Sequence, residues 1–185
     1  MIDLNKLVDS GKYDGPFSDM KPFITLLAGL TIALDAKLVL EIGTGFLFST
    51  KAFLWGLEKT KGQIITCDPV KRWEELSRLK RWAYFSHPQF QFIQKTSQEV
   101  AKTWNKQIDI LFIDGSHEYE SVLFDYKTFS PFVRKGGLII FHDTNPPTKT
   151  AKGAGKVCQG IKEMEKLIFG KTPGLTVFQK TEAHK

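Results

Sequence analysis

Long apolar segments are absent from the sequence. No run reaches the roughly 18–20 residues that a membrane-spanning helix needs, and the longest candidate, Pro22–Leu34, contains Thr25, Gly29 and Thr31. The opening segment MIDLNKLVDS carries acids and lacks the apolar core of a secretory signal. These absences argue against insertion into a membrane and against export, so we expect a cytoplasmic protein without a membrane partner.

Cysteine is scarce as well. The chain of 185 residues has two, Cys67 and Cys158, and they lack the spacing of metal ligands. Cys67 lies inside a run that is typical of a buried strand, where cysteine usually acts as a small hydrophobic residue. This usage argues against a cysteine-ligated metal site and fits a reducing compartment.

The chain has no concentrated block of charge of one sign. Its formal net charge is +6, which would suit nucleic acid if the basic residues formed one patch. The basic segment Lys71–Arg81 also contains Glu74 and Glu75, and its apolar spacing predicts an amphipathic helix with a solvated basic face. A second segment, Lys149–Lys166, could attract an anionic substrate or form a solvated loop and helix. Nucleic acid is therefore not the expected partner.

Strand-like and helix-like segments alternate along the chain, which predicts an α/β fold with a mostly parallel, doubly wound sheet. The length predicts a single domain over residues 1–185, in which residues 1–20 form a lead-in that could fold over a site. Strands are expected at Leu38–Ile42, Gln63–Cys67, Gln91–Gln94, Ile108–Ile113, Gly137–Phe141 and Gly174–Lys180, the last pairing with Leu167–Phe169. Helices are expected at Phe23–Leu34, Ser49–Leu57, Lys71–Phe85, Ser97–Trp104, Tyr119–Phe132 and Lys156–Lys166.

A glycine turn between two acids is the most informative motif. In LVLEIGTGFLFS, Glu41 ends a strand, and Gly43 and Gly45 follow before a helix that begins near Ser49. Asp68 ends the next predicted strand. Glycines let the backbone approach a ligand closely, and a carboxylate can bind both hydroxyls of a ribose. The third glycine of a dinucleotide-binding G-x-G-x-x-G motif is absent, so the pattern favours S-adenosylmethionine over a dinucleotide.

Polar residues also follow the later strands. In an open α/β sheet the carboxyl ends of the strands form one rim, and ligands bind there. Polar groups at five consecutive strand ends predict a site on that rim more strongly than any single motif does. Besides the two acids, these groups are Thr96, Ser97 and Gln98, then Asp114, Ser116 and His117, then His142, Asp143, Thr144 and Asn145.

The segments EIGTGFLFS, CDP and FIDGSHEYESVLFDYKTFSPFVRKGGLIIFHDT together resemble the class I S-adenosylmethionine-dependent methyltransferases. Within that class, the chain is most similar to the small catechol-type and sugar-modifying O-methyltransferases. The resemblance covers Pro22–Lys180. It implies a Rossmann-like sheet of about seven strands, here with a shortened C-terminal hairpin and a stunted sixth strand. It also implies methyl transfer to an oxygen of a small-molecule acceptor, in many members with a divalent metal.

The resemblance further implies roles for individual residues. Asp68 matches the acid that binds the ribose, while Asp114 and Asp143 match two metal carboxylates. His117 stands where related enzymes have a catalytic base, with Asp114 beside it in the catalytic set. Other expected cofactor-binding residues are Glu41, Gly43, Thr44, Gly45 and Ser49 around the methionine moiety, Ser97 and Gln98 beside the adenine, and Asp114.

These residue types suit the chemistry. Carboxylates with a hydroxyl or amide oxygen from Thr144 or Asn145 are ligands for Mg²⁺ or another divalent cation, although the family pattern has an asparagine where Thr144 stands. His142 could lie beside the metal or point into the sheet. His117 could accept a proton from the acceptor or merely cap the following helix.

Two alternative functions stay open at this point. The chain could be a Rossmann-type protein that binds a nucleotide cofactor without methyltransferase activity, or it could be an RNA methyltransferase that uses Lys71–Arg81. Trp55, Trp82 and Phe85 would suit the face of a homodimer.

Overall fold

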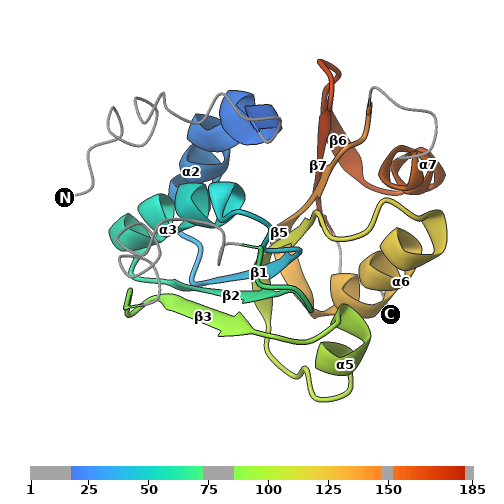
Figure 1. Ribbon diagram of the computed structural model, residues 1–185. Helices are drawn as coiled ribbons and strands as arrows, with labels where there is room; N and C mark the ends of the chain where they lie inside the picture. Colours follow the sequence, from blue (N-terminus) through green and yellow to red (C-terminus); the bar gives the residue numbers. More distant parts are fainter. Residues whose placement is uncertain (1–17, 73–85, 147–151, 182–185) are drawn as a thin grey trace.

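The computed structural model describes residues 18–72, 86–146 and 152–181. Its centre is a seven-stranded sheet in the order β3-β2-β1-β4-β5-β7-β6 (Figure 1). The first five strands in this order run parallel, and β7 is antiparallel to both β5 and β6. The strands are β1 (Leu38–Ile42), β2 (Gln63–Cys67), β3 (Phe90–Ile93), β4 (Ile108–Ile113), β5 (Val133–His142), β6 (Glu165–Phe169) and β7 (Leu175–Gln179).

Helices cover both faces of this sheet (Figure 1). One face carries α2 (Ile24–Ala33), preceded by the 3₁₀ helix η1 (Ser18–Phe23), and α3 (Phe48–Thr60). The other face carries α5 (Ser97–Ala101), α6 (Tyr119–Phe129), the short η3 (Ser130–Phe132) and α7 (Gly153–Gly160).

The central strands contribute to two hydrophobic cores because successive side chains point to opposite faces. Leu40 of β1 and Leu111 of β4 pack under α5, α6 and α7, whereas Val39 and Ile110, their neighbours in the chain, pack under α2 and α3. All five residues of β1 are buried. Burial on both faces explains why these strands are nearly continuous apolar runs in the sequence.

The point where the chain changes direction across the sheet lies between β1 and β4. After β1 the chain builds β2 and β3 on one side, and it then returns to build β4 and β5 on the other. Gly43, directly after β1, has a φ of 93°. A Cβ on Gly43 would overlap the backbone carbonyl of Asp114, directly after β4. The sequence therefore needs glycine there, and the two strand ends come close together.

Most predicted elements are confirmed, including the bounds of β1, β2 and β4 and the C-terminal hairpin. Two expectations are wrong. The helix expected at Lys156–Lys166 runs instead over Gly153–Gly160, and the chain turns extended at Ile161. The sixth strand is not stunted, because all of β6 pairs with β7 from Glu165 to Phe169.

Some expectations concern parts of the chain outside the described residues. These parts include residues 1–17 of the predicted lead-in and residues 73–85 of the predicted basic helix, with Trp82 and Phe85. Trp55, on α3, is half-buried. Within the described ranges, none of the helices has the length and apolar character needed to cross a bilayer.

Candidate active site

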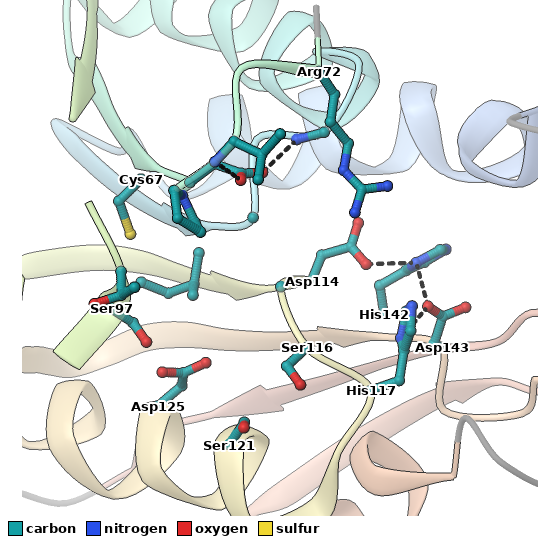
Figure 2. A pocket seen from close by; sticks show the side chains of 18 of the residues that line it. Cys67, Arg72, Ser97, Asp114, Ser116, His117, Ser121, Asp125, His142 and Asp143 are labelled. Atoms are coloured by element: carbon teal, nitrogen blue, oxygen red, sulfur yellow. Dashed lines mark hydrogen bonds and ion pairs between the residues drawn. The ribbon is translucent and has the colours of Figure 1, made fainter. Parts of the chain in front are cut away.

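A pocket of about 460 Å³ opens at the carboxyl ends of the parallel strands. Its wall is built from the segments that follow β1, β2, β3, β4 and β5 and from the inner face of α6. Figure 2 shows its polar side chains facing one cavity. The predicted site residues that line it are Gly43, Gly45, Asp68, Ser97, Gln98, Asp114, His117 and Asp143, and other polar groups on the wall come from Arg72, Thr96, Ser116, Ser121, Asp125 and His142.

Asp68 ties the end of β2 to the glycine turn after β1. Its Oδ2 accepts hydrogen bonds from the backbone N–H groups of Thr44 and Gly45, each at 3.2 Å. Its Oδ1 accepts one from the N–H of Val70 at 2.8 Å. A carboxylate offers roughly four acceptor positions. The contacts therefore fix the orientation of this carboxylate and leave it able to accept a further hydrogen bond from the pocket.

Glu41 does not reach the pocket, although it lies one residue before the end of β1. Its side chain is fully buried on the α3 side of the sheet. Ser49 and Thr50 donate their hydroxyls to its two oxygens at 2.5 and 2.6 Å. Burial raises the pKa of Glu41 to about 7, against the lowering effect of these hydrogen bonds.

The structure thus separates three expected cofactor residues from the others. Glu41 and Ser49 bond to each other inside the fold. The Thr44 hydroxyl meets that of Thr66 at 2.6 Å, in a buried contact. None of the three lines the pocket, although the backbone N–H of Thr44 orients Asp68.

Two carboxylates and two imidazoles converge at the opposite end of the pocket (Figure 2). His142 Nδ1 lies 3.0 Å from Asp114 Oδ1 and 3.7 Å from Asp143 Oδ2. His117 Nδ1 lies 3.1 Å from the same oxygen of Asp143. His142 is 2% exposed, whereas the side chain of His117 is 54% exposed. The cluster therefore has a buried part and a part at the mouth of the pocket.

The charges in this cluster stabilise one another. Burial lowers the pKa of His142, but the charges and hydrogen bonds of Asp114 and Asp143 outweigh it and raise this pKa to about 10. The hydrogen bond to Asp143 raises the pKa of His117. Burial acts to raise the pKa of Asp143, yet the two histidines together hold it well below its usual range. Figure 2 also shows the Arg72 guanidinium pointing toward Asp114.

The donor set of the cluster fits a divalent cation. One ligand atom each from Asp114, His142 and Asp143 lie within 4.8 Å of one another. Carboxylates suit Mg²⁺ or Mn²⁺, and an imidazole adds affinity for transition metals. To act as a ligand, His142 must lose the proton that the two carboxylates stabilise. Thr144, the expected third ligand, does not line the pocket. Its buried hydroxyl lacks a partner among the described residues and faces Gly174.

The other end of the pocket contains Ser97, Gln98 and a carboxylate that the sequence analysis missed. Ser97 and Gln98 begin α5, whose first turn is capped by Thr96 and Glu99. Asp125, on α6, is 2% exposed and lines the pocket together with them. A signal was present in the sequence, because Asp125 falls on the apolar stripe of a predicted helix. It lies three residues after Val122 and four before Phe129, and both of these are buried.

The chain also matches a protein family and a curated relative. A family model described as a methyltransferase domain matches residues 40–144, more than half of the chain. The chain is 28% identical over 107 residues to the O-methyltransferase hkm8 of Aspergillus hancockii, a match that covers 58% of this chain and 40% of that protein. The chain spans 20% and 40% of the lengths of two curated relatives that it matches.

Solved structures share the fold. The methyltransferase PaMTH1 of Podospora anserina, solved with SAH bound, superposes with a TM-score of 0.75 at 16% identity, over 98% of this chain and 89% of that one. The O-methyltransferase TomG of Streptomyces achromogenes, solved in complex with SAM, gives 0.69 at 16% identity, over 98% and 92%. At such identities the likeness shows a common Rossmann-like architecture, with a mostly parallel seven-stranded sheet and an antiparallel C-terminal hairpin.

Proposed function

Since the chain belongs to the family of methyltransferase domains, we propose that its pocket binds S-adenosylmethionine and that the protein methylates an oxygen of a small molecule. The observation that carries the proposal is the order in which the acids and the glycine turn lie at the ends of neighbouring strands. Asp68 after β2 and Asp114 after β4 flank the glycine turn after β1, on one pocket wall. The activity of hkm8 and the SAM complex of TomG support the same cofactor and acceptor atom.

The residues of the chain divide the pocket into two ends. Asp68, oriented by the glycine turn, accepts a hydrogen bond from a ribose hydroxyl. Ser97 and Gln98 lie beside the adenine. The turn at Gly43 and Gly45 has no side chains there, so the backbone can approach the methionine part closely. The carboxylate–histidine cluster then lies at the reacting end.

When bound, S-adenosylmethionine supplies an electrophilic methyl group on a sulfonium whose leaving group is a neutral thioether. The chain must hold the acceptor oxygen in line with that group and remove its proton; alignment of this kind can contribute roughly 7–11 kcal/mol to lowering a barrier. With Nδ1 of His117 donating to Asp143, Nε2 has the lone pair that accepts the proton. The negative charge of Asp143 stabilises the resulting imidazolium.

Asp114, Asp143 and His142 would hold a divalent cation, for which their donor atoms are suitably spaced. Such an ion would lower the pKa of a hydroxyl bound to it and help to orient the acceptor. The side chain of His117 is half exposed at the mouth, so the acceptor enters from that side. A small molecule is the acceptor that suits a site of this size.

The test is calorimetric titration of the purified protein with S-adenosylmethionine and with S-adenosylhomocysteine, using NADH as the control ligand. We expect micromolar binding of both adenosyl compounds and no binding of NADH. Each titration is repeated with Mn²⁺, with Mg²⁺ and with a chelator. Binding of NADH in place of the adenosyl compounds would instead support a nucleotide-binding protein without methyltransferase activity.

A further inference from the structure

Asp125 lines the pocket, and one of its carboxylate oxygens is buried without a hydrogen bond to any described residue. The side chain is 2% exposed, and Oδ1 has no hydrogen-bond partner in the part of the chain that the structure describes. The Ser97 side chain lies close enough to lower the pKa of this carboxyl group, but it supplies no hydrogen bond to Oδ1. An unpaired buried acceptor destabilises the folded protein, and more so when it is charged, so its retention in a ligand pocket requires an explanation.

The surroundings of Asp125 do not compensate its charge. Burial raises its pKa to about 6, and the only opposing influence is the hydrogen bond from Ser97. The nearby thiol of Cys67 is no cation, and burial together with the charge of Asp125 raises its pKa to about 12. A hydrogen-bond donor on a bound ligand would supply the missing partner of Oδ1.

The position of Asp125 indicates which part of the ligand it meets. Figure 2 shows the carboxylate beside Ser97 and Ser121, at the opposite end of the cavity from His117, His142 and Asp143. Ser97 follows β3, the edge strand farthest from β5 in this half of the sheet. On the function proposed above, the reacting methyl group lies at the histidine end, so the nucleobase lies at the Asp125 end.

We propose that Asp125 Oδ1 accepts a hydrogen bond from the exocyclic amino group of the cofactor's adenine and thereby selects adenine over a base without that donor. Adenine has one such donor, N6, while N1, N3 and N7 are acceptors that a carboxylate cannot pair with. The inference rests on the proposed function. It adds a specificity-determining residue to a site in which α5 alone was expected to contact the base.

The experiment compares S-adenosylhomocysteine with S-inosylhomocysteine, in which a carbonyl oxygen replaces the amino group and N1 gains a hydrogen. At the position of N6, Asp125 Oδ1 then meets an acceptor that repels it instead of a donor. For the parent protein we expect the adenosyl compound to bind about tenfold to a hundredfold more tightly, as for a hydrogen bond to a charged group. Asp125→Leu should weaken the binding of S-adenosylhomocysteine and bring its affinity within about threefold of that of the inosyl compound. Asp125→Asn should also narrow the ratio, because its amide can donate to the carbonyl of hypoxanthine.

Ser121→Ala is the matched control, since Ser121 lines the same wall one helical turn before Asp125. It should leave the ratio of the two affinities unchanged. Thermal melting of each variant separates loss of folding from loss of selectivity. If Asp125 had only a structural role, its replacement would not change the ratio of the affinities for the adenosyl and inosyl compounds.

The outcomes separate the two proposals. If the parent protein binds the adenosyl compound but does not distinguish it from the inosyl compound, the role of Asp125 is overturned while the proposed function stands. The same follows if the ratio survives in both Asp125→Leu and Asp125→Asn. If the parent protein binds neither S-adenosylmethionine nor S-adenosylhomocysteine, both proposals fail.

Discussion

Replacing Glu41 with glutamine should change how stability depends on pH. Glu41 is completely buried, and its burial raises its pKa from the ordinary 4.5 to about 7. Between these two values the folded protein retains the proton, whereas the unfolded chain releases it. Stability therefore falls as pH rises through this window, and the loss is complete above pH 7. A pKa difference of this size corresponds to about 3 kcal/mol.

Glutamine has the same shape and no charge, and its amide can still pair with the hydroxyls of Ser49 and Thr50, which can act as donors or acceptors. Glu41→Gln should therefore gain stability relative to the parent protein by about 3 kcal/mol between pH 4.5 and pH 8. The other titrating groups are common to both proteins and cancel in the difference.

The assay is urea unfolding of both proteins across this range, with Glu120→Gln, at an exposed position on α6, as the control. The free energy of unfolding of the Glu41 variant minus that of the parent should rise with pH, while the same difference for the control stays flat. A flat difference for Glu41→Gln would mean that Glu41 is ionised in the folded state at acidic pH and would refute this reasoning.

Three further predictions concern the proposed active site. Asp68→Asn keeps an acceptor for the glycine turn but removes the charge, so the affinity for S-adenosylhomocysteine, measured by calorimetry, should fall about tenfold. Unchanged affinity would refute a hydrogen bond between Asp68 and the ribose. His117→Ala should lower the methylation rate by about 10² to 10⁴-fold with little change in cofactor affinity, and a rate within a few-fold of the parent would leave His117 a structural role. A chelator should abolish turnover, and Mn²⁺ should restore it, while cofactor binding persists; full activity in chelator would exclude a metal held by Asp114 and Asp143.

The sequence was sufficient to predict the sheet and the rim on which the site lies. β1, β2 and β4 are short apolar runs that end at polar residues, and both features have local causes: a strand covered on both faces must be apolar, and its exposed end need not be. Because ligands bind at the carboxyl ends of the strands in such sheets, Asp68, Asp114 and Asp143 were expected at one site, and they line one pocket. The glycine at position 43 was likewise recognisable, because its role depends on backbone approach.

The direction of each side chain needed the tertiary structure. Glu41 lies one residue before the end of β1, and its side chain points toward α3 and bonds to Ser49. Asp68 directly follows β2 and lines the pocket. Both acids follow short apolar runs in the sequence, which does not show that Glu41 is covered by α3 and Asp68 is not. The segment after Gly160 is a similar case. The pairing of Leu167–Phe169 with the last strand was predicted, but the helix ends at Gly160 and β6 begins at Glu165, where pairing with β7 starts.

His142 and Asp125 show the same division between sequence and structure. The sequence determined that a histidine follows β5 and that an aspartate interrupts an apolar helical stripe. The packing of α6 and β5 against β4 decided that His142 lies between two carboxylates. It also left one oxygen of Asp125 buried without a hydrogen-bond partner among the described residues. Side-chain environment arises from segments distant in the chain, whereas the period of a strand or helix is written in its own residues.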